Sequence, residues 1–254
     1  MNPGIIQLSR PFAVMPRGLL GYQTPVPTTY PLAASDGNIT NGLVAWWKLD
    51  ETKGVVASDS SGNGLNGTLN GGFQFSYSPG IVGNSLANML GTTGGGATRY
   101  ISVPNNALLN FANDFTMCGW CNNRSEGFAF KKNDSNTLGQ YNFSIRSPGY
   151  NGIYFRTGSI SDVYPTTDQY PLLIDGYWHH VCATRSVNIV SIYIDGIKLK
   201  VTGNPAYYSF AANTVPLQLL GNGSADDLRM YNRALSDSEV KALYEYRSPK
   251  YWEP

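Results

Sequence analysis

The sequence is poor in charged residues and has no strong accumulation of either sign. Asp, Glu, Lys and Arg make up 14% of its 254 residues, and the formal net charge is +1. No basic cluster is larger than the pair Lys131 and Lys132. A protein that binds nucleic-acid phosphates needs concentrated Lys and Arg, so we expect no nucleic-acid partner. No apolar run approaches the roughly 20 residues that cross a bilayer, so we expect no membrane insertion.

Cysteine and histidine are also scarce. The cysteines are Cys118, Cys121 and Cys182, and because their number is odd, at least one thiol stays unpaired. Secreted disulfide frameworks usually contain even numbers of cysteines, so this count indicates synthesis in a reducing compartment. Cys118 and Cys121 are three residues apart in a predicted strand and therefore face opposite sides, as do the adjacent His179 and His180. We interpret all five side chains as structural.

What the sequence does contain is a repeated period-two pattern. In residues 43–49 the odd-numbered Leu, Ala, Trp and Leu alternate with Val44, Trp46 and Lys48, which predicts a strand with one face on a core. Apolar residues also alternate in 190–194 and resume in 197–201 after Asp-Gly, which predicts a hairpin. Together with 28 glycines, these short strands indicate an all-β sandwich.

One helix is predicted near the C-terminus. Ser236 is followed three residues later by Glu239, which is the pattern of a capping box. Val240, Leu243 and Tyr244 follow at helical spacing. We therefore expect a short amphipathic helix that closes the domain.

Two segments near opposite ends of the chain carry a family resemblance. They are Gly42-Leu-Val-Ala-Trp-Trp-Lys-Leu-Asp-Glu51 and Asp226-Asp-Leu-Arg-Met-Tyr-Asn-Arg-Ala-Leu-Ser236. With the intervening blocks, they resemble the laminin-G-like and concanavalin-A-like jelly rolls. The intervening blocks are residues 59–69, 100–106, 115–120, 178–184 and 192–196.

The resemblance implies an all-β fold: a two-sheet antiparallel jelly-roll sandwich with one short C-terminal helix. The predicted organisation is an extended Pro-rich N-terminal arm in residues 1–41, the jelly-roll domain in 42–245 and a C-terminal tail in 246–254. Residues 122–177 match the family poorly, and the arm matches nothing in it.

A calcium site is predicted at the turn that contains Asp59, Asn63 and Asn66. Hard cations prefer oxygen ligands gathered by a Gly-rich turn. The resemblance implies one structural calcium ion at such a turn, near the acidic pair Asp226 and Asp227. The alternative is that Asp59 and Asn63 only make hydrogen bonds within the turn.

Glycoside hydrolysis needs two carboxylates beside the scissile bond, and the sequence shows no pair in a glucanase pattern. Glucanases of the resembled family carry Glu-x-Asp-x-x-Glu on one strand, and none of the five glutamates stands in that pattern. There is also no Gly-x-Ser-x-Gly elbow, His-Glu-x-x-His motif or phosphate loop. We expect no enzymatic activity. The glutamates are Glu51, Glu126, Glu239, Glu245 and Glu253.

Tyrosines are concentrated in the part of the chain that matches the family poorly. A tyrosine ring has a flat apolar face and a polar rim, which suits it to stack on sugars or to fill protein interfaces. About half of these side chains are expected in the core, and the rest at protein contacts or on glycans. The predicted ligand-binding residues are Tyr141, Tyr150, Tyr164, Tyr170, Tyr207 and Tyr208.

Residues 1–41 contain no acidic residue before Asp36, and their prolines predict an extended backbone. Pro and Gly interrupt every apolar stretch that could form a secretory signal. We interpret the segment as an arm that lies along a neighbouring subunit, because its apolar side chains suit a purely solvated tail poorly. The alternative is a disordered leader or linker. The predicted arm contacts are Phe12, Leu19, Leu20, Tyr22 and Tyr30.

These features predict a structural, non-catalytic binding protein of a larger assembly. The assembly we expect is a bacteriophage virion, in which the chain is a capsid decoration, head fibre or tail adhesin made in the host cytoplasm. Its expected partners are capsid or appendage subunits, other copies of itself in a homo-oligomer, and cell-surface glycans. The alternative is a free-standing, extracellular carbohydrate-binding module of the lectin type.

Overall fold

The structure is a computed structural model of the chain, which divides into two units, Met1–Pro31 and Leu32–Pro254. The described residues all belong to the second unit, and the five predicted arm contacts lie outside them. The described residues are 39–71, 75–88, 99–123, 127–132, 141–145, 152–157, 161–166, 173–187, 189–202, 213–219 and 222–247.

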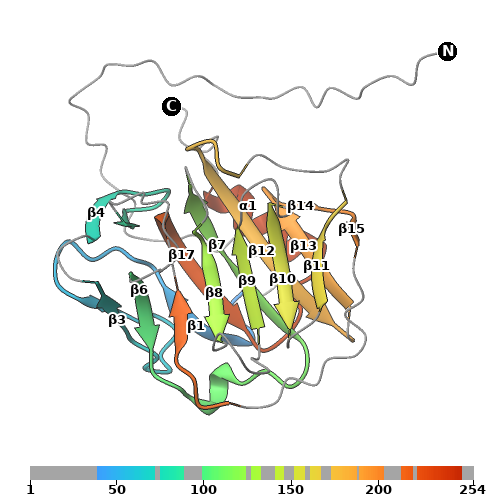
Figure 1. The fold of residues 1–254 in the computed structure, drawn as a ribbon, viewed down its shortest axis with the longest axis horizontal. Coiled ribbons are helices and arrows are strands. Elements are labelled where there is room, and N and C mark those ends of the chain that lie inside the picture. The colour runs from blue at the N-terminus through green and yellow to red at the C-terminus, as the bar shows by residue number, and fades with distance from the viewer. Residues whose placement is uncertain are drawn as a thin grey trace. The chain divides into compact units, whose positions relative to one another are not determined.

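One antiparallel sheet contains eight of the described strands (Figure 1). Strand β1 pairs with β17 beside the main path of the sheet. The order across the sheet is β14 (Ile197–Lys198), β13 (Ile189–Ile194), β12 (Trp178–Ser186), β7 (Phe115–Asn122), β17 (Gly223–Tyr231), β5 (Asn84–Asn88) and β4 (Phe75–Pro79), with β1 (Leu43–Trp47) on β17.

The second antiparallel sheet contains nine described strands. A short 3-10 helix, η1 (Ala107–Leu109), follows β6. The order across this sheet is β15 (Val201–Thr202), β11 (Ser161–Pro165), β10 (Ile153–Thr157), β9 (Tyr141–Ile145), β8 (Ala129–Lys132), β16 (Leu217–Leu219), β6 (Tyr100–Val103), β3 (Gly67–Asn70) and β2 (Val56–Ala57).

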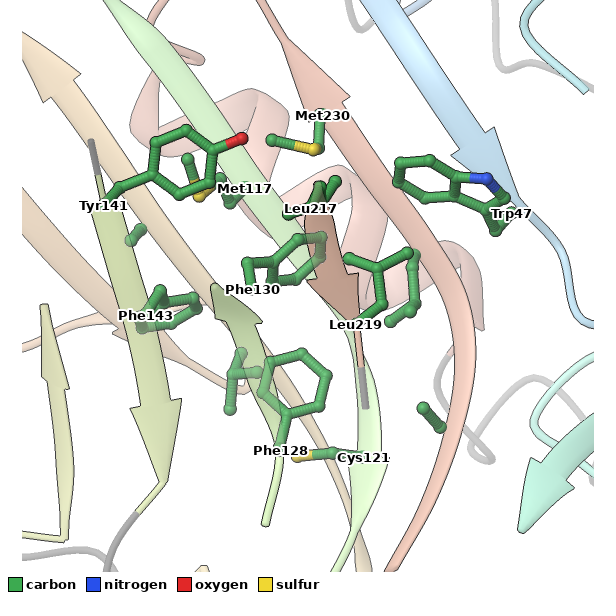
Figure 2. Packing of buried hydrophobic residues seen from close by; sticks show 14 of the residues in the cluster. Trp47, Met117, Cys121, Phe128, Phe130, Tyr141, Phe143, Leu217, Leu219 and Met230 are labelled. Carbon is green, nitrogen blue, oxygen red and sulfur yellow. The ribbon is translucent and has the colours of Figure 1, made fainter. Parts of the chain in front are cut away.

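The core lies between the two sheets. Met117 and Met230 enter it from the eight-stranded sheet, while Phe130 and Phe143 enter from the nine-stranded sheet (Figure 2). Trp47 is fully buried there, and its Nε1 donates a hydrogen bond to Leu65 O at 2.8 Å. Two antiparallel sheets packed face to face confirm the predicted jelly-roll sandwich.

The alternation predicted from residue 43 is broken at its start. The pairing of β1 with β17 is irregular between Leu43 and Ala45. As a result, Val44 is buried in the core between the sheets, and Leu43 packs against a second cluster on the outer face of the eight-stranded sheet. The period-two alternation therefore does not hold between Leu43 and Ala45, because an irregular pairing shifts the register.

The predicted hairpin forms between β13 and β14. Asp195 and Gly196 adopt φ values of 50° and 75°, which is the combination that a two-residue I′ turn requires. The apolar run from 197 to 201 does not continue as one strand. It divides into β14 in one sheet and β15 in the other, because β15 pairs with β11.

The predicted capping box begins the helix α1 (Asp237–Arg247). Ser236 N donates to Glu239 Oε2 at 2.8 Å, and Glu239 N donates to Ser236 Oγ at 3.2 Å. Val240 and Leu243 pack on the outer face of the eight-stranded sheet, so α1 covers that face behind β7 and β12 (Figure 1). Within the described part of the chain, no helix has the length and apolar character needed to cross a bilayer.

Candidate functional site

A row of polar side chains crosses the outer face of the nine-stranded sheet. Its members stand opposite one another on consecutive strands β6, β16, β8, β9 and β10. Each is adjacent in sequence to at least one residue of the core, so each points away from it. We call this set the polar row: Ser102, Gln218, Lys131, Asn142 and Arg156.

A buried hydrogen-bonded group lies beside part of the polar row, on the same face of the sheet. Asn142 Nδ2 donates to the hydroxyl oxygen of Tyr154 at 3.0 Å, and Ser144 Oγ donates to Asn142 Oδ1. The Arg156 guanidinium lies 5.5 Å from the centre of the Tyr154 ring. These contacts hold Asn142 and Arg156 in place before any ligand arrives, which lowers the entropy lost on binding.

The rest of the row is partly exposed. Ser102, Lys131, Arg156 and Gln218 are neither fully buried nor fully exposed. Their hydroxyl, ammonium, guanidinium and amide groups supply donors for the row and acceptors at two positions. Such a surface can hydrogen bond to a ligand with many hydroxyl groups, and its two cations also suit a negatively charged substituent.

The predicted ligand-binding tyrosines are not all at the surface. Tyr141 is 1% exposed, packs among core phenylalanines and donates its hydroxyl hydrogen to Leu109 O at 3.2 Å, so its ring cannot stack on a sugar. Tyr164 is half-buried beside the core residue Val163 and thus lies on the outer face of the nine-stranded sheet. Four others lie outside the described residues: Tyr150, Tyr170, Tyr207 and Tyr208.

The predicted calcium turn is internally hydrogen bonded. The Asp59 carboxylate accepts from the backbone N–H groups of Trp46, Ser61 and Leu65 at 2.9 to 3.0 Å. Burial would raise the pKa of Asp59, but these hydrogen bonds lower it overall. Asn66 Oδ1 accepts from Asp59 N, and Asn63 Nδ2 donates to Val44 O.

The remaining predicted ligands, Asp226 and Asp227, have different surroundings. Asp227 is paired with Arg229 at 3.0 Å and accepts from Trp46 Nε1 at 2.5 Å. Asp226 is 1% exposed, and its Oδ2 accepts from Ile81 N and Val82 N at 2.7 and 3.0 Å. Its Oδ1 is buried and has no hydrogen-bond partner among the described residues. Burial, followed by the charge of Asp227, raises the pKa of Asp226 well above its usual value.

The loop of residues 80–84 packs directly on two carboxylates. Asn84 N donates to Asp50 Oδ1 at 2.9 Å. A Cβ atom at Gly83 would lie 2.1 Å from Asp50 Oδ1, and one at Gly80 would lie 2.5 Å from Asp226 Oδ2. Glycine is therefore required at both positions for the backbone to approach the carboxylates.

The donor set around Asp226 fits a hard cation in its chemistry. An unpartnered carboxylate oxygen and a second carboxylate, Asp50, whose charge reaches it are both oxygen donors. Among the described residues, however, no three Asp, Glu, His or Cys side chains are grouped so that they could hold a metal ion. The predicted calcium ligands therefore form two groups with different surroundings: the turn that contains Asp59, and the acidic pair that contains Asp226.

Several residues of these sites were not predicted. Asp50 stands directly after the first core strand, but no motif distinguishes it from other turn residues. The polar row had a detectable signal in residues 141–145, where Tyr, Phe and Ile alternate with Asn142 and Ser144. That alternation predicts a strand, yet only the pairing of the strands brings Asn142 beside Lys131 and Arg156.

Comparison with protein families gives one match. A family model described as the concanavalin A-like lectin/glucanases superfamily matches residues 93–241, which is more than half of the chain. A search of curated proteins finds no match.

Solved structures with the same fold include toxin and enzyme domains. The binding domain of Paraclostridial Mosquitocidal Protein 1 aligns with a TM-score of 0.63 and 20% identity, over 82% of this chain and 52% of that chain. Domain 4 of AbnA, a GH43 extracellular arabinanase from Geobacillus stearothermophilus, in complex with arabinotriose, aligns with a TM-score of 0.62 and 23% identity, over 80% of this chain and 98% of that chain.

A third similar structure is the binding domain of Botulinum neurotoxin DC in complex with rat synaptotagmin II. It aligns with a TM-score of 0.61 and 14% identity, over 83% of this chain and 53% of that chain. This chain therefore spans about half the length of the two toxin chains. At these sequence identities the similarity shows a shared fold and does not establish a shared function.

Proposed function

This chain belongs to the concanavalin A-like lectin/glucanase superfamily, and we propose that it is a non-catalytic recognition module that binds glycans on the outer face of its nine-stranded sheet. Two of the similar structures are binding domains of toxins, and a third, a domain of an arabinanase, is in complex with an oligosaccharide. The polar row is the observation that carries the proposal. Five polar side chains lie side by side on this face. The backbone hydrogen bonds that pair the strands do not require polar side chains there.

The chemistry of the row fits a sugar better than an apolar ligand. A sugar presents adjacent hydroxyl groups that both donate and accept hydrogen bonds. Gln218 offers an amide and Ser102 a hydroxyl, while Lys131 and Arg156 offer charged donors, which form stronger hydrogen bonds than neutral ones. The buried Tyr154 beneath Arg156 keeps that guanidinium in position.

The absence of a catalytic role is part of the proposal. The sequence contains no carboxylate pair in a glucanase pattern, and the five residues of the polar row include no acidic one, although Asp162 of β11 pairs in register with Arg156. Glycoside hydrolysis requires a general acid and a second carboxylate on opposite sides of the scissile bond. A binding surface requires neither.

Glycan-array binding by the full chain tests the proposal. We expect the wild type to bind a defined set of glycans and Arg156→Ala or Lys131→Ala to bind them at least tenfold more weakly. Lys53→Ala is the matched control, because Lys53 is exposed and lies outside the row. Absence of wild-type binding to any glycan, or binding by both row variants at the wild-type level, would refute the proposal.

The finer proposal is that this module is a surface protein of a virion, anchored by residues 1–41 as part of a homo-oligomer. It rests on the Pro-rich, apolar composition of that segment. Removing residues 1–41 should leave a folded sandwich that no longer assembles, as measured by sedimentation of the free protein and by its incorporation into particles. Unchanged assembly of the shortened chain would contradict an anchoring role for the segment.

We also propose that Asp226 and Asp50 hold a structural calcium ion. When bound there, it would supply positive charge that offsets two neighbouring carboxylates. Asp226 is tied to the backbone of residues 81 and 82, and Asp50 to that of residue 84. The two side chains thereby link the loop of residues 80–84 to β17 and to the end of β1.

A further inference from the structure

Two of the three cysteines stand directly opposite each other on neighbouring strands. Cys118 of β7 pairs in register with Cys182 of β12. Opposed residues of an antiparallel pair point to the same face, and their Cα atoms are about 4.5 to 5.5 Å apart. A disulfide requires a Cα separation of about 4.4 to 6.8 Å. The register therefore brings the two Cα atoms within the range that a disulfide spans.

Both side chains belong to the apolar cluster on the outer face of the eight-stranded sheet, under α1. Cys118 is 1% exposed and Cys182 is fully buried, in contact with a layer that includes Val240 and Leu243 of the helix. Cys121 lies on the opposite face, in the core between the sheets, and its Sγ donates to His179 O at 3.6 Å. The fold thus selects one of the three possible cysteine pairs.

The two thiols also differ in acidity. Hydrogen bonding from Cys182 lowers the pKa of Cys118 below its usual value; burial opposes this shift, while hydrogen bonding and charge from His180 add to it. Burial raises the pKa of Cys182 above its usual value. A thiolate is the nucleophile in thiol–disulfide exchange, so Cys118 is the sulfur that attacks and Cys182 is the one that completes the bond.

We propose that Cys118 and Cys182 form an oxidisable pair that closes into a cross-strand disulfide when the protein meets a low-molecular-weight disulfide. The Cys118 thiolate attacks one sulfur of the reagent and releases one thiolate from it. The Cys182 sulfur, after losing its proton to solvent, then attacks the mixed disulfide and releases the second thiolate. Two protein thiols are oxidised, and one reagent disulfide is reduced to two thiols.

The helix α1 controls access to the pair. Because both sulfurs are buried beneath it, a reagent reaches them only when α1 detaches from the sheet in a local opening. Loosening the helix should therefore accelerate oxidation. Leu243→Ala removes apolar contact from the layer over the cysteines, whereas Lys241→Ala changes an exposed position of the same helix.

Thiol counting and peptide mapping of the full chain after incubation with oxidised glutathione test the proposal. We expect the loss of two free thiols, a peptide linking Cys118 to Cys182 and a free Cys121. Leu243→Ala should form the link at least fivefold faster than the wild type, and Lys241→Ala at the wild-type rate. Cys182→Ser should stop at a glutathione adduct on Cys118, and Cys121→Ala should behave as the wild type.

Three results would overturn the proposal. One is that all three thiols stay free in both the wild type and Leu243→Ala. Another is a link that involves Cys121. The third is a persistent glutathione adduct in the wild type, because an adjacent Cys182 thiol should displace it.

Discussion

The Arg233 guanidinium forms a two-point contact with the Glu239 carboxylate. Nη1 lies 2.9 Å from Oε2, and Nη2 lies 2.6 Å from Oε1. The same carboxylate accepts from Ser236 N, and Arg233 Nε donates to Asn41 O at 2.8 Å. One glutamate thus caps α1 and connects its first turn, through Arg233, to the chain just before β1.

Glu239→Gln should lower the free energy of unfolding at pH 7 by about 1 to 2 kcal/mol. The loss is limited because solvent screens this partly exposed ion pair and because glutamine retains some of the hydrogen bonds. Urea unfolding measures the change. Lys241→Gln is the control, because its contact with Glu245 at 3.7 Å is at the surface and should contribute less than about 0.5 kcal/mol. Equal losses in the two variants would contradict a special role for Glu239.

The same pair predicts a loss of stability in acid. Hydrogen bonds from Arg233 lower the pKa of Glu239 from 4.5 to about 2. Since the folded-state pKa lies below the unfolded value, the contribution is fully present above about pH 4.5 and is lost as the pH falls toward 2. Wild-type protein should therefore lose more stability between pH 5 and 3 than Glu239→Gln does, as measured by urea unfolding at each pH.

The contribution of His179 to stability should have the opposite dependence on pH. Burial would lower its pKa, but Asp195 at 2.9 Å and Asp175 at 3.3 Å outweigh burial and raise it. Because the folded-state pKa lies above the unfolded value, the stabilisation is fully present below the unfolded value of about 6.5 and is lost as the pH rises through the folded value.

Asp195→Asn should reduce that dependence. Asparagine tolerates the positive φ of residue 195, so the turn is preserved while the charge next to His179 is removed. We expect a loss of about 1 to 2 kcal/mol at pH 6 and a smaller loss at pH 8.5. Urea unfolding at the two pH values decides the matter, and an equal loss at both would argue against the ion pair as its cause.

Lys132 is buried, and none of its partners among the described residues is a carboxylate. Its ammonium group donates to Asn105 Oδ1, Asn213 Oδ1 and Val215 O at 2.7 to 2.8 Å, and burial lowers its pKa to about 8. Lys132→Met keeps the aliphatic stem but leaves these acceptors without their donor. The expected loss of stability is about 1 to 3 kcal/mol in thermal or urea unfolding. Lys131→Met changes the neighbouring outward-facing lysine and should cost less than about 0.5 kcal/mol.

The calcium proposal predicts a thermal response that depends on Asp226. Added calcium should raise the melting temperature of the wild type, and EDTA should lower it. Asp226→Asn should lose this response and, without calcium, should melt at or above the wild-type temperature, because burial disfavours the charge that it removes. A wild-type melt that neither EDTA nor added calcium changes would argue strongly against the ion.

The sequence predicted those elements whose signals are local. The capping box at Ser236 and Glu239 formed as expected, because both of its hydrogen bonds lie within four residues of one another. The Asp195-Gly196 turn formed for a similar reason, since its backbone angles depend on the two residues themselves. The position of the strand beginning at Leu43 was predicted, but its irregular pairing was not, because that pairing depends on β17, almost 190 residues away.

The candidate sites were predicted less completely than the fold. Tyr141 looked like a surface aromatic because period-two alternation does not say which face of a strand meets the core. The polar row could not be found from sequence, because Ser102, Gln218 and Arg156 come from strands that are distant in the chain. Asp226 and Asp227 are adjacent and chemically identical, yet one is paired with Arg229 and the other has an unpartnered oxygen.

By itself, the sequence determined that this protein is an antiparallel sandwich of low charge with a capped terminal helix, because apolar periodicity, turn residues and caps act over a few residues. Only the tertiary structure decided which side chains meet across strands: the five polar residues on one sheet face, the two opposed cysteines and the lone oxygen of Asp226. These contacts depend on strand order and register. Strand order and register result from the packing of two whole sheets and not from any one segment.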